Sequence, residues 1–482
     1  MHTRDAHERY LIIDQGGHAS RAFVFDARGR QLAAATREIR AHRPDELRAE
    51  YDGGALWASI AGAVTQALAA APGPVAAAGL ATQRSNVACW DRTSGEPLGP
   101  VISWQDRRAW RTVEALRPYE KTIHERTGLF LTPHYGASKL RWCLDHLPEV
   151  RRAHEEGRLG FGPMAAWLAG RLAGGAARAA DVVNASRTQL VALEARDWDD
   201  GLLRLFGLPR DPLPPVAPNA WGYGSLAAAP EVPLALVTGD QNAALFAYGE
   251  LNKETAYVNA GTGAFVLRAT GARLVRPERL LAGVLHDGGG RVEYVLEGTV
   301  NGAGSALARF AEEYGVKDLT DKLGGWLEEV PASPLVFLNG VSGLGSPFWR
   351  ASFPVRFEGE GGLAEKAVAV VESIVFMLAV NLEEQARYLP APRRIRLTGG
   401  LANLDGLAQR LADLSGLPVL RPPGLEATAR GAAFLLAGRP ADWEAGGAPD
   451  AFEPRPNPAL AANYARWQET VEAELDSSAP SS

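Results

Sequence analysis

Cysteine is scarce in this chain of 482 residues, which contains only Cys89 and Cys143. The two lie far apart in the sequence and do not have the spacing of metal ligands. We therefore predict two free thiols in a reducing compartment rather than a disulfide framework. The histidines also lack metal-ligand spacing, so we assign none of them to a metal.

Long apolar runs and an excess of positive charge are also missing. No run of about 18 apolar residues predicts a membrane span, and residues 1–5 do not form an apolar signal segment. We expect a cytoplasmic protein. The formal net charge is −6, which argues against nucleic acid as a partner because such proteins usually carry a basic face. A phosphate-bearing ligand is still compatible, since backbone amides in glycine loops bind phosphates without lysine or arginine.

Two familiar nucleotide motifs are absent from the sequence. It has no G-x-x-x-x-G-K-[ST] loop, and no glycine-rich kinase loop followed by H-R-D. If the chain is a kinase, it uses another architecture.

What the sequence does contain is a repeated plan of short strands and glycine turns. An apolar run at 10–13 leads into Asp14-Gln15-Gly16-Gly17 and returns at 22–25, with a third strand at 31–35. The same order recurs when 255–259 leads into Gly261-Thr262-Gly263 and returns at 264–267. The recurrence suggests a duplicated domain, although glycine hairpins are common.

Elsewhere, β-like and helical patterns alternate, which indicates an α/β architecture of two or three domains. The predicted strands are 75–80, 87–90, 234–237, 394–397 and 418–420. The predicted helices are 56–70, 138–147, 164–172, 242–248, 364–388, 407–414, 428–436 and 464–475. Residues 208–233, rich in proline and glycine, are predicted to form a loop, and the last residues, 477–482, to be disordered.

Several candidate site residues stand at strand ends. Asp14 could hold a magnesium ion through water, and the adjoining glycines let the backbone approach a phosphate; the alternative is a plain hairpin. Gly261-Thr262-Gly263 offers amides and a hydroxyl for phosphates, and Gly399-Gly400 leaves room for a flat ligand such as adenine. Tight turns without a ligand remain the alternatives for both.

Asp240 follows the strand at 234–237 and opens a helix. It could cap that helix, or it could be the base that takes a proton from an attacking hydroxyl in phosphoryl transfer. Arg84 and Trp104 also follow strand-like runs, and they suit a polyol by donating hydrogen bonds and offering a flat apolar wall. An ion-pair cluster with a buried tryptophan is the alternative.

Taken together, these pieces resemble the FGGY carbohydrate kinases, and among them most closely the glycerol kinases. The resemblance runs from about residue 10 to residue 438. It is carried by the following segments: Asp14-Gln15-Gly16, Ser20-Arg21-Ala22, Gln83-Arg84, Trp104-Gln105-Asp106-Arg107-Arg108, Asn184-Ala185-Ser186-Arg187-Thr188, Gly239-Asp240-Gln241, Gly261-Thr262-Gly263, Gly399-Gly400 and Glu426-Ala427-Thr428-Ala429-Arg430-Gly431.

The resemblance implies an α/β fold of two actin-like, ribonuclease H-like ATPase domains with a cleft between them. We expect an N-terminal domain over 1–249 on the sugar side, a C-terminal domain over 250–440 on the nucleotide side, and a tail with one helix over 441–482. The implied activity is ATP-dependent phosphorylation of a sugar or polyol hydroxyl with Mg²⁺. A homodimer is left open.

By the same resemblance, Asp240 is the base and Asp14 and Asp240 serve the metal. The residues implied to face the polyol are Arg84, Ser85, Trp104, His134, Asp240, Gln241 and Phe265. The residues implied to face ATP are Gly16, Gly17, His18, Arg21, Gly261, Thr262, Gly263, Gly399, Gly400 and Asp405.

Three departures from the glycerol kinases bear on function. Their Thr-Thr after the first Asp-Gln-Gly is Gly17-His18 here, which removes hydroxyls worth about 1.5–3 kcal/mol each when they bind charged groups. Their glutamate after the substrate arginine is Ser85, and their substrate tyrosine is His134. We therefore predict a kinase whose substrate is not glycerol. The alternative hypothesis is a weakly active or inactive sugar or nucleotide sensor on a kinase scaffold.

Overall fold

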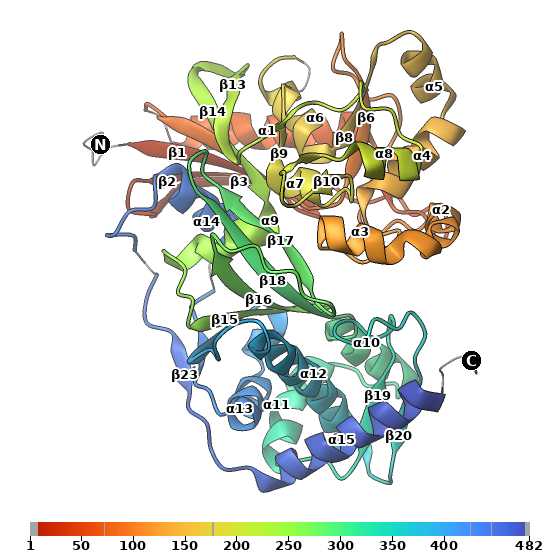
Figure 1. Cartoon of the computed structure of the whole chain (residues 1–482). Coiled ribbons are helices and arrows are strands. Elements are labelled where there is room, and N and C mark those ends of the chain that lie inside the picture. The colour runs from red at the N-terminus through yellow and green to blue at the C-terminus, as the bar shows by residue number, and fades with distance from the viewer. Residues whose placement is uncertain (1–7, 72, 176–177, 425, 445, 478–482) are drawn as a thin grey trace.

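The computed structural model describes residues 8–71, 73–175, 178–424, 426–444 and 446–477. Two lobes are visible in Figure 1, an upper one from the first half of the chain and a lower one from the second half. Each lobe has its own large hydrophobic core, and a further apolar cluster contains residues of both.

The upper lobe is built on a six-stranded sheet in the order β13-β14-β5-β1-β2-β3. β1 pairs with β2 in antiparallel fashion and with β5 in parallel, and β14 is parallel to β5. The carboxyl ends of β1, β5 and β14 therefore lie side by side at one edge. The strands are β1 (Arg9–Gln15), β2 (Ala19–Asp26), β3 (Gln31–Glu38), β5 (Ala77–Thr82), β13 (Ala220–Leu226) and β14 (Ala229–Gly239).

Helix α1 (Gly53–Ala70) covers this sheet beside β2 and β3. By length and composition alone it is apolar enough to cross a membrane. However, Leu56, Ile60 and Val64 recur along one face and are buried in the core of the lobe, which is the pattern of an amphipathic helix packed on a sheet. Its first turn is capped by Asp52, whose carboxylate accepts from the Ala55 amide at 2.7 Å.

The upper lobe also has a second layer. It contains a small sheet in the order β4-β7-β6-β8, surrounded by short helices. The strands are β4 (Glu50–Tyr51), β6 (Val87–Asp91), β7 (Val101–Ile102) and β8 (Leu159–Pro163). The helices include α2 (Trp110–Ala115), α3 (Glu120–Thr127), α4 (Gly136–His146), α5 (Pro148–Glu155), α6 (Met164–Leu172), α7 (Val182–Ser186) and α8 (Asp200–Phe206).

The lower lobe repeats the plan of the upper one. Its seven-stranded sheet has the order β17-β18-β16-β15-β21-β22-β23, in which β15 pairs with β16 in antiparallel fashion and with β21 in parallel. These are the pairings of β1 with β2 and β5, as expected for the predicted duplication. The strands are β15 (Thr255–Ala260), β16 (Ala264–Gly271), β17 (Leu281–Asp287), β18 (Val292–Val300), β21 (Arg394–Thr398), β22 (Val419–Arg421) and β23 (Asp450–Phe452).

Helix α12 (Leu363–Ala386) runs through the core of the lower lobe and is buried along most of its length. The sequence places it at 364–388, so its existence and its N-terminal bound are confirmed. The other helices of this lobe include α10 (Gly304–Glu313), α11 (Leu319–Glu329), α13 (Asp405–Ser415) and α15 (Pro458–Ser477).

The lobes are joined closely where α14 (Ala427–Leu436) packs against α9 (Asp240–Leu245) and the strands β1 and β5. A Cβ on Gly431 would lie only 1.7 Å from the Ala243 carbonyl oxygen. Only glycine fits at this crossing, so α14 rests directly on α9, the helix that begins at Asp240.

Two sequence expectations need correction or completion. The predicted loop at 208–233 is wrong in its second half, because β13 and β14 form a hairpin there. Pro230 and Pro233 lie on the part of β14 that pairs with β13 alone, beside a register shift and before the pairing with β5 begins at Leu234, so a missing backbone donor is tolerated there. The tail also contributes β23 to the sheet in addition to a helix. Of the residues predicted to be disordered, 477–482, Ser477 instead ends helix α15, and 478–482 lie outside the described residues.

Candidate active site

Asp14 and Asp240 occupy matching places at the carboxyl ends of strands on either side of β5. Asp14 on β1 and Thr238 on β14 both pair with Ala81 of β5. Only β5 therefore separates the end of β1 from the start of the helix at Asp240. The N-cap of α9 is Gly239, and Asp240 is the first helical residue. Its carboxylate accepts from the Gln241 amide at 2.6 Å, and the side chain is half-buried.

Burial dominates the electrostatics of both carboxylates. Desolvation raises the pKa of Asp240, and Arg84 and Arg187 oppose that rise by favouring the charged form. The pKa of Asp14 is raised to about 7, first by burial and then by the negative charge of Asp240. A buried carboxylate whose proton affinity is raised by a second carboxylate nearby is a favourable place for a cation.

Arg21 partly offsets this charge at Asp14. Its Nη1 lies 3.9 Å from an Asp14 carboxylate oxygen and 2.6 Å from a Glu426 carboxylate oxygen. Glu426 stands just before α14, so this pair also crosses between the lobes. The predicted phosphate-facing Arg21 is therefore half-exposed beside Asp14 and already has an acidic partner.

Arg84, directly after β5, is held from several sides. Its Nη1 donates to the Asn242 side-chain oxygen at 3.1 Å and lies 3.4 Å from a Glu297 carboxylate oxygen. Its Nη2 donates to the side-chain oxygen of Gln241. The predicted polyol-facing residues Arg84 and Gln241 are thus in direct contact beside Asp240.

Trp104 and His134 lie together on the acceptor side, with ring centroids 5.3 Å apart. Gln83 links them to the first glycine turn. In the amide orientation that suits its neighbours, its oxygen accepts from the Gly17 amide at 3.2 Å and from the Trp104 indole at 3.3 Å. Burial holds the pKa of His134 well below its usual range, so this ring is neutral.

Ser85 differs from its neighbours because its hydroxyl is buried without a hydrogen-bond partner among the described residues. Its φ is 66°, an uncommon backbone conformation for a residue other than glycine. Lys139 fixes the local backbone by donating to the carbonyl of Ser85 at 3.3 Å and to that of His134 at 2.6 Å. Burial lowers the pKa of Lys139 to about 7.

The glycine turns of the lower lobe line a pocket of about 700 Å³. Gly399 has φ 94° and approaches β15 so closely that a Cβ would lie 2.4 Å from the Ala260 carbonyl oxygen. The side of Gly400 is open, since a Cβ there would meet nothing within 4 Å. The lining residues are Gly261, Thr262, Gly304, Ser305, Ala308, Arg309, Glu312, Gly400 and Leu401.

Three residues that were predicted to face ATP or the polyol do not line this pocket. Asp405 does not line this pocket, because its carboxylate is 2.6 Å from Arg421 Nη1. His18 is exposed at the tip of the β1–β2 turn. Phe265 on β16 packs at the margin of the apolar cluster shared by the two lobes.

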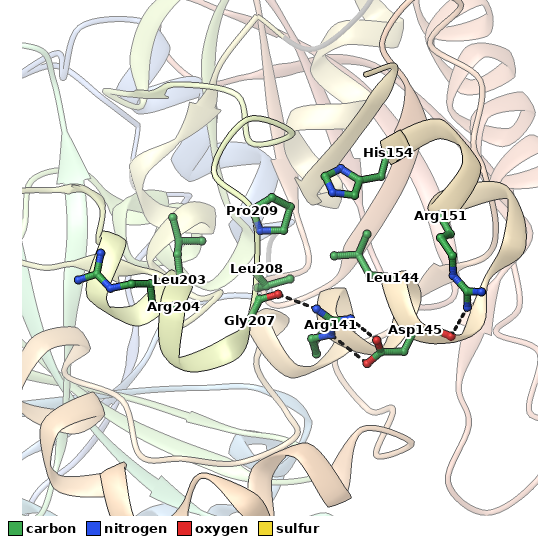
Figure 2. Close-up of a pocket in the computed structure, with 10 residues that line it drawn as sticks. All are labelled: Arg141, Leu144, Asp145, Arg151, His154, Leu203, Arg204, Gly207, Leu208 and Pro209. Atoms are coloured by element: carbon green, nitrogen blue, oxygen red, sulfur yellow. Dashed lines mark hydrogen bonds and ion pairs between the residues drawn. The ribbon is translucent and has the colours of Figure 1, made fainter. Parts of the chain in front are cut away.

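A second hollow of about 690 Å³ lies away from these residues, between α4, α5 and α8. Figure 2 shows that its charged side chains are largely engaged with one another or with the backbone. Arg141 binds the carboxylate of Asp145 and the carbonyl of Gly207, and Arg151 donates to the Asp145 carbonyl at 2.6 Å. This hollow contains none of the predicted site residues.

Sequence reasoning missed several contributors to the site. Glu297 on β18 contacts Arg84 from the other lobe, and Ser305, Arg309 and Glu312 of α10 line the nucleotide-side pocket. A signal for α10 was available, because a glycine turn, Gly302-Ala303-Gly304, follows a strand there and opens a helix. The only sign of Glu297 in the sequence is one acidic residue within a strand-like run, which is a weak indication of a site residue.

Two lobes with the same strand plan, with carboxylates at one set of strand ends and glycine turns at the other, have the actin-like, two-domain ATPase fold. The chain belongs to the FGGY family of carbohydrate kinases. The family's N-terminal domain matches residues 9–247 and its C-terminal domain matches residues 256–438. It is therefore an ATP-dependent carbohydrate kinase, as the sequence predicted.

Individual relatives agree with this assignment. The glycerol kinase of Geobacter sp. (strain M21) is 38% identical over 446 residues, which cover 89% of each chain. That of Deinococcus radiodurans is 34% identical, covering 89% of this chain and 88% of the relative. Among solved structures, the Plasmodium falciparum glycerol kinase with ADP has a TM-score of 0.88 at 21% identity, covering 98% and 99%. A ligand-bound xylulose kinase from Lactobacillus acidophilus has a TM-score of 0.84 at 19%, covering 97% and 99%.

Proposed function

We propose that this kinase transfers the terminal phosphoryl group of ATP to a hydroxyl of a polyol or ketose other than glycerol, with Asp240 as general base. The observation that carries the proposal is the position of Asp240. It is a half-buried carboxylate with a raised pKa at a strand end, and it lies beside Arg84 and Gln241, whose side chains are hydrogen-bonded to each other.

In this reaction the Asp240 carboxylate accepts the proton of the acceptor hydroxyl as the hydroxyl oxygen bonds to the terminal phosphorus of ATP. The bond from that phosphorus to the bridging oxygen breaks, and ADP leaves. Burial suits Asp240 to this role, because a carboxylate with a raised pKa is a stronger base than a solvated one. Arg84 and Gln241 position the acceptor, and Trp104 provides an apolar wall for its carbon chain.

Magnesium fits the residues at the end of β1. Asp14 is buried, with a pKa raised by desolvation and by Asp240, and hard cations prefer carboxylate oxygens. Among the described residues, no group of three or more His, Cys, Asp or Glu side chains could enclose a metal ion. That agrees with an ion held through one or two carboxylates, waters and phosphates. When bound, the ion would neutralise phosphate charge, and Asp14, with Asp240, would hold it.

The acceptor pocket supports a substrate longer than glycerol. Ser85 and His134 are both smaller than the glutamate and tyrosine that the glycerol kinases carry at these positions. The Ser85 hydroxyl is buried and unpartnered among the described residues, and a buried hydroxyl gains from a partner. We propose that a hydroxyl on a fourth or later carbon of a polyol or ketose is that partner.

The test is ADP release over a panel of polyols, ketoses and sugar acids, with glycerol included. We expect turnover with an acceptor of four or more carbons that exceeds turnover with glycerol. Asp240→Asn should lower kcat by about 10²–10⁴-fold while ATP still binds in calorimetry. Unchanged turnover in this variant would exclude Asp240 as the base, and tight ligand binding without transfer to any acceptor would favour a sensor.

A further inference from the structure

We propose that Glu297 is a positioning residue for phosphoryl transfer, holding Arg84 and Arg187 at the acceptor site from the opposite lobe. The inference rests on the proposed function, because it concerns the arginines beside the proposed base. Glu297 lies on β18, whereas Arg84 follows β5 and Arg187 follows α7.

Glu297 has an unusual place for a charged side chain. In the register of the lower sheet it stands opposite Leu267 of β16, and by strand alternation it shares a face with Val295. Val295 and Leu267 pack in the apolar cluster that the two lobes share. A carboxylate on this face would be costly without partners, so its neighbours must explain its presence.

Those neighbours are the two arginines. A Glu297 carboxylate oxygen lies 3.4 Å from Arg84 Nη1, and the same oxygen accepts from Arg187 Nη2. The side chains of Arg84, Arg187 and Glu297 are 9%, 7% and 3% exposed. Arg187 also hydrogen-bonds to Tyr135. One buried carboxylate therefore fixes two guanidinium groups that come from separate segments of the other lobe.

The arrangement places Arg84 beside the proposed base. Arg84 Nη2 donates to the side-chain oxygen of Gln241, the residue after Asp240, and Arg84 Nη1 donates to the side-chain oxygen of Asn242 at 3.1 Å. Without Glu297, Arg84 would lose one of the contacts that hold it, and Arg187 would lose its acidic partner. A misplaced guanidinium group would no longer hold the acceptor hydroxyl in a near-attack geometry.

A purely structural role is the competing explanation, since buried ion pairs also join elements without taking part in chemistry. The chain offers a matched control in Glu372 and Arg410 within the lower lobe. Their side chains are 0% and 5% exposed and 3.6 Å apart, and neither approaches the acceptor residues described above. If each ion pair only stabilises the fold, removing its glutamate should lower stability in both cases and affect activity equally.

The first experiment compares Glu297→Gln with Glu372→Gln in thermal unfolding and steady-state kinetics with the best acceptor. We expect both variants to unfold at lower temperature. Only Glu297→Gln should lower kcat/KM for the acceptor, by about 100-fold, with the KM for ATP changed less than about threefold. Glu297→Asp, which keeps the charge, should recover part of the activity. Equal kinetic losses in the two Gln variants would overturn the proposal.

The second experiment needs no turnover. NMR of ¹⁵N-labelled arginine side chains reports how rigidly the Arg84 and Arg187 guanidinium groups are held, with their signals identified by their absence in Arg84→Lys and Arg187→Lys. Both signals should shift and show faster guanidinium rotation in Glu297→Gln, and Glu372→Gln should not change them. If no acceptor is phosphorylated, the proposed function fails while this measurement still decides whether Glu297 holds the two arginines. Unchanged Arg84 and Arg187 signals in Glu297→Gln would refute that role.

Discussion

The stem of Arg84 lies against the backbone of Gly239, so closely that a Cβ on this glycine would come within 2.7 Å of the arginine Cγ. The glycine immediately precedes Asp240. Arg84 and Asp240 are thus held at their separation by the absence of a side chain at Gly239.

Replacing Gly239 by alanine should therefore displace Arg84 without straining the backbone, because φ at this position is −80°, which alanine adopts readily. We expect the KM for the acceptor to rise about tenfold, since misplacing a positioning group weakens a near-attack geometry. The KM for ATP should stay the same. Steady-state kinetics with each substrate varied in turn would measure both effects.

Gly222→Ala is the matched control for this substitution. Gly222 lies on β13, and an added Cβ would meet nothing within 4 Å. Its kinetics should equal those of the unmodified enzyme. A normal acceptor KM in Gly239→Ala would show that the stem of Arg84 can shift without cost.

The pH dependence of turnover should follow the charge near Asp240. Burial raises its pKa, and Arg84 lowers it. Asp240 must be unprotonated to act, so the rate should rise with pH through its pKa. Removing the positive charge in Arg84→Gln raises that pKa further, and the acid limb should shift to higher pH. The loss in kcat should then be larger at about pH 6 than at about pH 8, and a parallel loss at both would contradict this coupling.

Asp14→Asn should stabilise the free protein at alkaline pH. The folded-state pKa of Asp14 is about 7, above its ordinary 3.8, so its ionisation opposes folding. The destabilisation is absent below the unfolded pKa, grows between about pH 4 and 7, and is fully present above. Thermal unfolding in the absence of nucleotide should therefore show a higher Tm for the variant at about pH 8 and little difference at about pH 4. Magnesium-dependent turnover should be lost in the same variant.

The first glycine turn should respond differently at its two unusual positions. A Cβ on Gly17 would lie 2.8 Å from the end of the Gln83 side-chain amide, and Gln83 contacts the Trp104 indole. Gly17→Thr should therefore raise the KM for the acceptor several-fold. His18 is exposed, so His18→Thr should leave the acceptor KM unchanged and alter only the KM for ATP. Isothermal titration with an ATP analogue would separate the two effects.

The sequence predicted the strand ends that carry chemistry because they follow local rules. Asp14, Asp240 and the glycines at 261–263 each come directly after an apolar run, and a strand followed by a turn can be recognised within about ten residues. The repeated pairing of β1, β2 and β5 by β15, β16 and β21 was visible for the same reason. Family resemblance then placed Arg84 and Trp104 on the acceptor side.

Contacts between distant segments could not be predicted in this way. Glu297 is separated from Arg84 by 213 residues, and only the packing of the two lobes brings them together. The loop expected at 208–233 failed for a related reason, because prolines are tolerated in the part of β14 that pairs with β13 alone, whereas a local pattern treats them as breakers. Asp405 is a third case. It begins helix α13, and its carboxylate is paired with Arg421 of β22 instead of lining the pocket.

The acceptor preference should change when the two altered pocket positions are restored. Ser85→Glu with His134→Tyr fills the space that we assign to the later carbons of the substrate and returns a carboxylate to the pocket. We expect kcat/KM for glycerol to rise about tenfold and that for the longer acceptor to fall by at least as much, since one bidentate hydrogen-bonded contact is worth about 1.5–3 kcal/mol. Competition between the two acceptors in one assay would measure the switch.

Ser85→Ala separates the hydroxyl from the volume. In the free protein the Ser85 hydroxyl is buried without a partner among the described residues, so its removal should leave stability unchanged or slightly raise it. If the hydroxyl binds a later substrate hydroxyl, the KM for the longer acceptor should rise about tenfold while the glycerol KM stays constant, because only the longer molecule reaches it. An equal change for both acceptors would place the Ser85 hydroxyl beside the carbons they share, and the extra room would then have to lie near His134.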